Sequence, residues 1–194
     1  MSAEDRVRWD AIYREQVNDP YPPPDPLLFD YTPPVTPDRE YRALDLAAGC
    51  GQNGLWLAAQ GYTVDIMDIS RVALLRAQAE MVKRNLRNVN LLPVDLDTVE
   101  LPMNFYDVVC VFRYLKRELF PQLRACIQPG GRIIYETFNV RYRAIVPEFN
   151  PAFLLEVGEL AGYFADWKIL LHSDDKHISR VVARKPEQAP PVQE

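Results

Sequence analysis

The sequence predicts one doubly wound α/β domain with a seven-stranded, mostly parallel sheet and an antiparallel last strand. Three observations predict this fold: short apolar runs alternate with helical patterns, a glycine-rich turn follows the first run, and the last two runs stand close together. Strands that alternate with helices favour a parallel sheet covered on both faces. Because a parallel connection needs about a dozen residues or more, the closely joined final strand should run antiparallel to its neighbour.

The chain begins with a helical pattern that leads into a proline-rich segment. Residues 3–17 carry apolar side chains at three- and four-residue intervals, which predicts an amphipathic helix. Eight of the 17 prolines fall within residues 20–37, so this segment cannot continue the helix or enter a central strand. Its apolar side chains favour an ordered connection. We expect the helix and connection over residues 1–40, the α/β domain over 41–184, and a polar, disordered tail over 185–194.

The rest of the chain supplies the alternating pattern of the α/β domain. Strands are predicted at seven apolar runs: residues 41–47, 62–67, 89–94, 106–112, 131–138, 167–172 and 178–184. Helices are predicted between them at residues 53–60, 71–86, 115–127 and 156–164. Gly61 is expected to cap the end of the first of these helices, and Ser70 the start of the second.

Composition argues against several classes of partner. The 22 basic and 27 acidic residues give a net charge of −5, without the basic stripe that a nucleic-acid or membrane surface would require. No apolar run reaches the roughly 18 residues of a spanning helix, and the first ten residues are too polar for a signal peptide. Cys50, Cys110 and Cys126 lie far apart, which favours neither a zinc site nor a disulfide framework. We expect a cytoplasmic protein, a monomer or homodimer, with no metal, nucleic acid or membrane partner.

The turn after the first strand is the most informative segment. Gly49 and Gly51 lie where the strand turns into a helix, so a ligand can approach bare backbone there. The helix that follows is expected to present unpaired N–H groups to an anionic ligand group. Asp68 closes the second strand, at the position from which an acid can accept hydrogen bonds from both hydroxyls of a ribose. These features predict a pocket for an adenosine-containing cofactor at the carboxyl edge of the sheet.

The type of cofactor is a separate question, because Gly49-x-Gly51-x-x-Gly54 matches the dinucleotide fingerprint. Asp45 argues against a nicotinamide cofactor, since its charge would repel a nearby pyrophosphate and attract an ammonium group. The chain also has little length left for a substrate domain. A closing hairpin is unexpected in a plain dinucleotide-binding fold.

A family resemblance rests on several of these motifs. Asp-x-Ala-x-Gly-x-Gly at residues 45–51, Asp68, Asp95 and Pro-Gly-Gly at residues 129–131 resemble class I S-adenosylmethionine-dependent methyltransferases, over about residues 41–184. The segment WDAIYRE and the segment LDLAAGCGQNGLWLAAQGYTVDIMDIS resemble most the TehB-like (tellurite-resistance-like) and thiopurine methyltransferase branch. One departure is Ala47, which stands where the family usually has glycine.

The resemblance implies a Rossmann-like fold, S-adenosylmethionine as cofactor and methyl transfer to a small-molecule acceptor. It implies that Asp45 and the backbone of residues 49–51 hold the amino-acid end of the cofactor and that Asp68 holds the ribose. Asp95 and the backbone of Leu96 would hold the edge of the adenine. The full set of expected cofactor-binding residues is Asp45, Ala47, Gly49, Gly51, Asn53, Asp68, Ile69, Asp95, Leu96, Phe112, Trp9 and Tyr13.

The acceptor is expected beyond the ends of the fourth and fifth strands, where ligands of open α/β sheets bind. Arg113, Tyr114 and Glu136 are the candidate catalytic residues there. Arg113 could clamp an acidic acceptor or form a structural ion pair with Glu136, and the ring of Tyr114 could face the sulfonium. Trp9 and Tyr13 could cover the pocket or simply pack on the sheet.

No convincing general base is evident, apart from Glu136 as a remaining candidate. This favours an acceptor that ionises readily, such as a thiol, a selenium or tellurium anion, or an acid. Two other functions stay open: a small NAD(P)-dependent oxidoreductase, and a non-catalytic cofactor-binding module that acts through a protein partner. We also expect the fold to tolerate Asp68→Ala, because this aspartate lies at a strand end.

Overall fold

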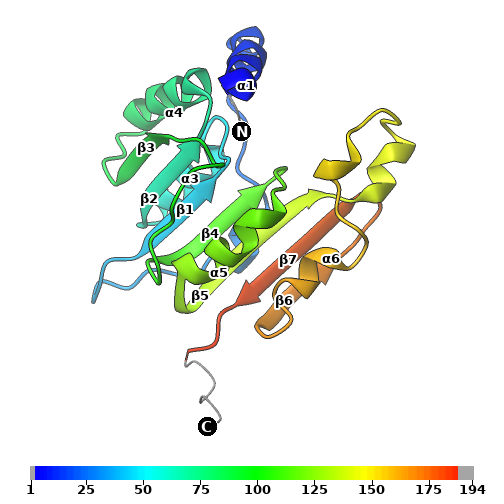
Figure 1. Ribbon diagram of the computed structural model, residues 1–194. Helices are drawn as coiled ribbons and strands as arrows, with labels where there is room; N and C mark the ends of the chain where they lie inside the picture. The colour runs from blue at the N-terminus through cyan, green and yellow to red at the C-terminus, as the bar shows by residue number, and fades with distance from the viewer. Residues whose placement is uncertain (1–2, 188–194) are drawn as a thin grey trace. The chain divides into compact units, whose positions relative to one another are not determined.

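The computed structural model describes residues 3–187, and these divide into two compact units, which we call unit 1 (up to residue 100) and unit 2 (from residue 101). Each unit combines strands with helices (Figure 1). The predicted tail begins at residue 185, and its residues 188–194 lie outside the described part of the chain.

Unit 1 is built on three parallel strands in the order β3-β2-β1. β1 (Arg42–Leu46) leads through α3 (Gln52–Ala59) to β2 (Thr63–Asp68), and β2 leads through α4 (Arg71–Lys83) to β3 (Val89–Pro93). α3 packs against β1 and β2, and α4 packs against β2 and β3. These elements agree with the predicted ones to within a few residues.

The two predicted helix caps of unit 1 are confirmed. The Ser70 hydroxyl oxygen accepts a hydrogen bond from the Ala73 N–H at 3.1 Å, which satisfies a backbone donor at the start of α4. Gly61 follows the C-cap residue of α3 and has a φ of 101°, a left-handed conformation that a side chain would disfavour.

The N-terminal segment of unit 1 contains two helices. α1 (Ala3–Glu15) corresponds to the predicted amphipathic helix and packs against α4. The proline-rich segment is an ordered connection, as predicted, but it also contains the five-residue helix α2 (Leu27–Tyr31), which the sequence analysis did not predict. Pro26 precedes α2 with helical backbone angles, so its ring fits the start of a helix. Leu28 is fully buried and anchors the segment.

Unit 2 contains four strands in the order β4-β5-β7-β6. β4 (Tyr106–Phe112) and β5 (Ile127–Phe138) are parallel, whereas β7 (Ile178–Arg184) runs antiparallel to both β5 and β6 (Lys168–Ser173). With the three strands of unit 1 this gives seven strands within residues 3–187. The predicted α/β class and the antiparallel last strand are confirmed.

Three predicted boundaries of unit 2 differ from the structure. The predicted helix at residues 115–127 is a 3-10 turn, η1 (Arg117–Leu119), followed by α5 (Phe120–Cys126), with Pro121 in the first turn of α5. β5 begins at Ile127 instead of residue 131, because the strand continues through an irregularity near Gly130, whose φ is 80°. The predicted helix at residues 156–164 is reduced to α6 (Glu159–Gly162).

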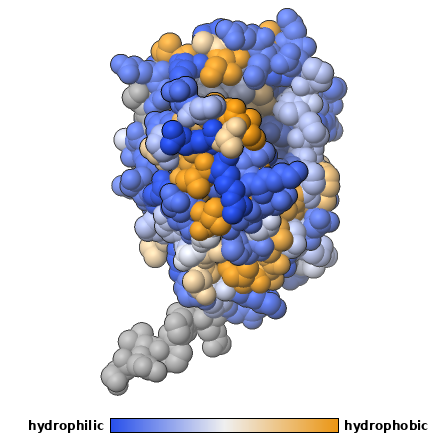
Figure 2. All heavy atoms as spheres, turned by 90° about the vertical axis from the view of Figure 1, so that its right-hand side faces the viewer, coloured by the Kyte–Doolittle hydropathy of each residue, from blue (hydrophilic) through white to orange (hydrophobic). Residues whose placement is uncertain are grey.

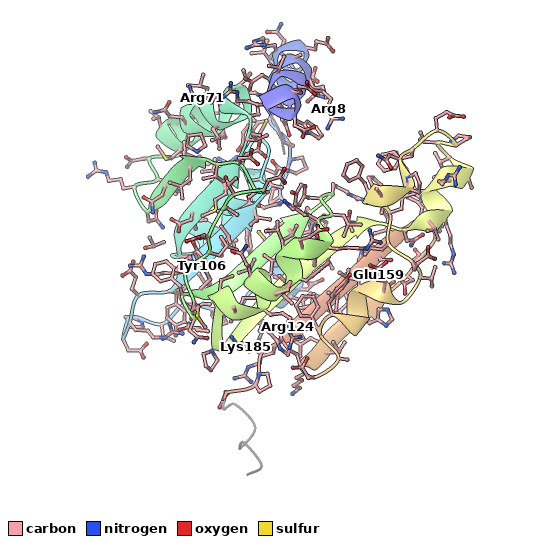
Figure 3. The ribbon with its side chains drawn as sticks, viewed as in Figure 1. Arg8, Arg71, Tyr106, Arg124, Glu159 and Lys185 are labelled. Carbon is pink, nitrogen blue, oxygen red and sulfur yellow. The ribbon has the colours of Figure 1, made fainter. Side chains whose placement is uncertain are left out.

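Two 3-10 turns, η2 (Val140–Ala144) and η3 (Pro151–Phe153), connect β5 to α6. Polar contacts also join other segments of unit 2 to one another. The Arg117 guanidinium binds the Glu159 carboxylate through two nitrogens, at 2.7 and 2.8 Å. Beyond β7, the Lys185 ammonium donates to the Arg124 carbonyl oxygen at 2.9 Å, and Figure 3 shows these two labelled side chains close together.

The surface of the described residues carries scattered apolar side chains. In unit 2 the large exposed ones include Met103, Ile145, Phe153 and Val157. On the face displayed in Figure 2, hydrophobic areas alternate with hydrophilic ones. Within residues 3–187, no helix has both the length and the apolar character needed to cross a membrane.

Candidate functional site

The turn between β1 and α3 adopts an unusual backbone. Ala47, Gly49 and Gly51 have φ values of 55°, 55° and 74°, all in the left-handed region. Glycine reaches this region without strain, whereas alanine pays roughly 1–2 kcal/mol. Ala47, the departure from the family pattern, therefore occupies a position whose conformation favours glycine.

Asp45 ties the end of β1 to the start of α3. The side chain is almost fully buried, at 1% exposed, and its Oδ2 accepts a hydrogen bond from the Gly54 N–H at 2.7 Å. The N-cap residue of α3 is Gly51, which has no side chain to cap the helix. Asp45 supplies that cap from the neighbouring strand, and its negative charge suits the N-terminal end of the helix dipole.

Asp68 organises the same turn from the end of β2. Its Oδ2 accepts from the Gly49 N–H at 2.7 Å, and its Oδ1 accepts from the Ser70 N–H at 2.8 Å. Burial raises the pKa of Asp68 above its usual value, and the hydrogen bonds from Ser70 and Gly49 offset part of that effect. The backbone N–H of Ile69 also contributes to this offset, and a carboxylate has about four acceptor positions, so some acceptor capacity remains.

These contacts revise two sequence-based expectations. The start of α3 was expected to present unpaired N–H groups to an anionic ligand, but the Gly54 N–H is already bonded to Asp45. The fold was expected to tolerate Asp68→Ala because this aspartate lies at a strand end; the structure shows that its side chain is only 8% exposed and bonds to two backbone segments, so a loss of stability is now expected. Carboxylates of the protein itself therefore satisfy backbone donors at this turn.

The other expected cofactor residues of unit 1 have different surroundings. Asn53 is buried, and its Oδ1 accepts from the Asp25 N–H at 2.8 Å, so it bonds to the proline-rich segment. Ile69 is buried directly after Asp68. Asp95 lies in the loop after β3, where its Oδ1 accepts from the Asp97 N–H at 2.9 Å, and the neighbouring Leu96 is buried.

Tyr13 and Trp9 lie on α1. Tyr13 is half-buried against the turn, and a Cβ at Gly49 would overlap its hydroxyl oxygen. Burial, followed by the nearby charge of Asp68, raises the pKa of Tyr13, so the phenol stays protonated. The Trp9 ring is also half-buried and lies 6.1 Å from the Tyr13 ring, centroid to centroid. The structure thus brings Tyr13 to the glycine turn.

Sequence reasoning missed several residues that contact the same region. Asp10 bonds to the start of α4, Tyr21 bonds to the carbonyl of Cys50, and Arg76 bonds to the segment after α1. The contacts join positions 29 to 62 residues apart. No spacing rule in the sequence predicts such pairs.

The expected acceptor residues lie in unit 2. Arg113 follows β4 with a φ of 57°, and its side chain is 46% exposed. Its Nη2 lies 2.8 Å from the Oε1 of buried Glu136, but the two groups lack the alignment of a hydrogen bond. The other carboxylate oxygen of Glu136 binds the Nε of Arg180, which stands directly opposite on β7. The structural ion pair between Arg113 and Glu136 is therefore present.

The two remaining residues at the end of β4 are half-buried. Phe112 pairs with Glu136 in the register of β4 and β5. The carbonyl oxygen of Tyr114 accepts a hydrogen bond from the Tyr135 hydroxyl at 2.8 Å, which fixes the backbone there. Both residues are therefore held at the carboxyl end of β4, the region where the sequence placed the acceptor.

Four partly exposed rings gather beside Arg113. Phe138 stacks on Tyr142, with centroids 4.0 Å apart, and Phe149 and His177 complete the group. The Arg113 guanidinium lies 4.9 Å from the centre of the Phe138 ring, within the range of a cation–π contact. Sequence analysis did not select this group, because its members come from β5, the following connection and the β6–β7 turn.

Neither metal coordination nor disulfide chemistry has a visible basis in the described residues. Within residues 3–187, no cluster of three or more histidine, cysteine or acidic side chains could hold a metal ion. All three cysteines are buried as thiols. Burial raises the pKa of Cys50 and Cys126, which makes these thiols less reactive.

The chain is similar to known proteins over most of its length. Residues 35–181 match the model of the family described as tellurite resistance protein TehB. A curated relative, the probable S-adenosyl-L-methionine-dependent methyltransferase TehB of Haemophilus influenzae (strain 10810), is 26% identical over 155 residues. That alignment covers 72% of this chain and 53% of the relative, so the chain spans about half the length of the curated relatives it matches.

Two solved structures have the same fold. TehB from Haemophilus influenzae superposes with a TM-score of 0.71 at 17% identity, covering 91% of this chain and 67% of that one. An S-adenosylmethionine-dependent methyltransferase from Mesorhizobium loti gives 0.66 at 19% identity, covering 82% and 96%. The expected Rossmann-like fold is therefore confirmed.

Proposed function

We propose that this chain, which belongs to the family of the tellurite resistance protein TehB, binds S-adenosylmethionine and transfers its methyl group to a small anionic acceptor. The cofactor would supply a methyl group that is already activated by its bond to a positively charged sulfur. The residues of the chain would then bind and orient the two reactants. Alignment of this kind can lower a barrier by up to about 7–11 kcal/mol.

The charge around the glycine turn is the observation that carries the cofactor assignment. Asp10, Asp45 and Asp68 each accept a backbone N–H at the turn or at the start of α3 or α4. The neighbouring guanidinium of Arg76 donates to the carbonyl oxygens of Gln16 and Asp19. Asp68 suits the ribose of either cofactor, but the carboxylate of Asp45 at the start of α3 would repel a pyrophosphate and attract the ammonium group of S-adenosylmethionine. This argues against the alternative of a nicotinamide cofactor.

The geometry of the turn also fits a nucleoside ligand. Asp68 keeps acceptor capacity for a ribose hydroxyl beyond its backbone hydrogen bonds. Gly49 and Gly51 allow the turn to adopt its left-handed backbone, with Tyr13 packed closely on Gly49. We propose the roles stated above for Asp45, Asp68 and Asp95, with Ala47, Asn53, Ile69, Leu96, Phe112, Trp9 and Tyr13 as the further contacts.

We assign acceptor binding to the half-exposed guanidinium of Arg113. Glu136 carries one negative charge and faces two guanidinium groups, so the cluster of Arg113, Glu136 and Arg180 has a net positive charge. Both oxygens of the buried Glu136 carboxylate face guanidinium groups, which favours Glu136 as a group that holds Arg113. An acceptor that is already ionised needs no base. Tyr114 would flank the reacting groups.

Acceptor screening with isotopically labelled S-adenosylmethionine tests this proposal. The panel contains thiols, selenite, tellurite and carboxylic acids, each organic acid paired with its uncharged amide or alcohol. We expect label transfer to the ionised acceptors. Arg113→Asn should lower kcat/KM by about ten- to a hundredfold, the range expected for a lost hydrogen bond to a charged group. Asparagine tolerates the positive φ at this position, so the backbone is preserved.

Arg143→Asn is the matched control, because Arg143 is an exposed arginine of the same unit whose Nε donates to the Pro147 carbonyl oxygen. It should leave kcat/KM unchanged. Equal loss in the two variants, or transfer to the uncharged acceptors alone, would refute the role of Arg113. Binding of the cofactor without transfer to any member of the panel would instead favour a non-catalytic module.

A further inference from the structure

We propose that the segment from Asp10 to Asp25, which precedes the part of the chain that matches the family, positions the glycine turn for cofactor binding, with Tyr21 as its principal positioning residue. The inference rests on the proposed cofactor site at this turn. Three separate hydrogen-bonded attachments, one at Tyr21, one at Asp25 and one at Asp10, join this segment to the turn and to the helix starts beside it.

The Tyr21 attachment fixes one peptide group of the turn. The Tyr21 hydroxyl donates to the Cys50 carbonyl oxygen at 2.6 Å. The N–H of the same peptide belongs to Gly51 and donates to the Ala48 carbonyl oxygen at 2.9 Å. A peptide group is planar, so hydrogen bonds on both of its sides hold its orientation. Gly51 has a φ of 74° and would otherwise reach many conformations.

Tyr21 is itself held in place. Its side chain is half-buried, and the Arg84 guanidinium, just beyond α4, lies 5.3 Å from the centre of its ring. Burial raises the pKa of Tyr21, so the hydroxyl keeps the proton that it donates. This hydrogen bond therefore persists across the physiological pH range.

The Asp25 attachment acts on the first turn of α3. The Asp25 N–H donates to Oδ1 of buried Asn53 at 2.8 Å, and the Asp25 carboxylate accepts from the Leu27 N–H at 3.0 Å. Asn53 lies next to Gly54, whose N–H is bonded to Asp45. The start of α3 is thus hydrogen-bonded both to the proline-rich segment, through Asp25, and to the end of β1, through Asp45.

The Asp10 attachment acts on the start of α4. Asp10 Oδ1 accepts from the Ser70 hydroxyl at 2.7 Å and from the Val72 N–H at 3.2 Å. The Ser70 N–H is bonded to Asp68, so a continuous set of hydrogen bonds leads from α1 to the proposed ribose-binding acid. Farther along α4, Arg76 donates to two carbonyl oxygens just after α1. The chain is thereby attached to α4 at the middle of α1 and just beyond its C-terminal end.

Packing alone does not account for these contacts. From Glu4 to Glu15, none of the side chains of α1 is fully buried, although Trp9, Ile12 and Tyr13 each bury part of their surface. Its attachments are instead polar and lie beside the residues proposed to bind the cofactor. A segment that only stabilised the fold would be expected to bury apolar side chains, as Leu28 does in α2.

Two tyrosine-to-phenylalanine variants test the inference. Tyr21→Phe removes the hydroxyl that bonds to the turn. Tyr62→Phe is the matched control, because the Tyr62 hydroxyl donates to the Pro33 carbonyl oxygen, also at 2.6 Å, away from the turn. Titration calorimetry measures the affinity for S-adenosylhomocysteine, chemical denaturation measures stability, and hydrogen exchange follows the Gly49 and Gly51 amides without ligand.

Tyr21→Phe is expected to weaken S-adenosylhomocysteine binding by about three- to tenfold, the range of one net hydrogen bond. It should also speed exchange of the Gly51 amide. Tyr62→Phe should lower stability by a similar amount but leave the affinity and the exchange unchanged. Affinity lost equally in both variants, or in neither, would overturn the positioning role. If the wild type does not bind S-adenosylhomocysteine, the proposed function fails, and the exchange of the Gly51 amide still decides whether Tyr21 orders the turn.

Discussion

The buried carboxylates of the two units have different kinds of partner. In unit 1, Asp45 and Asp68 accept hydrogen bonds from backbone N–H groups. In unit 2, Glu136 faces the side chains of Arg113 and Arg180. A backbone partner fixes the course of the chain, whereas a half-exposed guanidinium can exchange one anion for another. The difference suits a rigid turn that holds a cofactor, and a charged side chain that binds an acceptor.

The largest effect is expected from Asp68→Ala, which removes the carboxylate oxygens that accept hydrogen bonds from the Gly49 and Ser70 N–H groups. The buried Gly49 and Ser70 N–H groups lose charged partners, so we expect the free energy of unfolding to fall by about 3 kcal/mol. Affinity for S-adenosylhomocysteine should weaken by about a hundredfold or more, because the ribose acceptor is lost as well. Denaturation and calorimetric titration measure the two effects. Asp68→Asn keeps one acceptor oxygen and should fall between Asp68→Ala and the wild type.

An Asp68→Ala variant with unchanged affinity would place the ribose elsewhere. Unchanged stability with lost affinity would instead restore the sequence-based expectation that the fold tolerates this change. The first result would remove the proposed cofactor role of Asp68, and the second would remove its structural role, so each would weaken the contrast with Glu136 in a different way.

Glu136→Gln is the matching change in unit 2. The Arg113 and Arg180 guanidinium groups lose their shared negative charge, and since both are partly exposed to water we expect a loss of about 2 kcal/mol in unfolding free energy. Binding of S-adenosylhomocysteine should stay within about twofold of the wild type. Transfer to an anionic acceptor should fall, because Arg113 is no longer held. A large loss of cofactor affinity would show that the two clusters do not have separate roles.

A third prediction concerns pH. Burial raises the pKa of Asp68 above its ordinary value, so the folded protein takes up this proton at a higher pH than the unfolded chain. The contribution of Asp68 to stability therefore falls as the pH rises through the folded-state pKa. Affinity for S-adenosylhomocysteine should change in the opposite sense, because the neutral acid is a poorer acceptor, by at most about tenfold per pH unit.

A calorimetric series from about pH 7 down to about pH 4, near the ordinary pKa of an aspartate, follows this change in affinity. The affinity of the wild type should begin to fall at a higher pH than an unperturbed aspartate would allow. Asp68→Asn should not show that decline. A wild-type curve that stays flat, or one that Asp68→Asn reproduces, would contradict the assignment.

The smallest effects are expected at Ala47 in unit 1 and Arg113 in unit 2, two of the residues that have a positive φ. Ala47→Gly should raise the free energy of unfolding by about 0.5–1 kcal/mol, because glycine adopts a φ of 55° without strain. Arg113→Gly relieves similar strain but removes the ion pair with Glu136 and the contact with Phe138, so it should lower stability by about 1 kcal/mol. Equal stabilisation by both changes would mean that the Arg113 contacts contribute nothing.

The sequence predicted most of the fold because its signals are local. Apolar runs, the Gly61 and Ser70 caps and the close spacing of the last two strands each depend on neighbouring residues. The helix α2 was not predicted, since five residues between prolines give no periodicity. β5 begins four residues before its predicted start, because the strand includes a glycine-containing irregularity that the pattern of apolar residues does not reveal.

The candidate site was predictable to the extent that it follows from one turn. The motif at residues 45–51 and Asp68 stand at fixed spacing, and the structure brings them together. Asp10, Tyr21 and Arg76 reach this region from distant positions, so no motif identifies them. For Arg113 the sequence left two alternatives, binding of an acidic acceptor and an ion pair with Glu136. The ion pair depends on the register of β4 and β5, which the sequence does not give.

Binding of S-adenosylhomocysteine compared with NADH is the most direct test of the account. We expect S-adenosylhomocysteine, at about a hundred times its dissociation constant, to add about 2.7 kcal/mol to the free energy of unfolding, measured by thermal or chemical denaturation. NADH at the same concentration should add almost nothing, because the carboxylate of Asp45 at the start of α3 repels its pyrophosphate. Stabilisation by NADH, with no effect of S-adenosylhomocysteine, would contradict the central claim that this turn binds the nucleoside of a methyl donor.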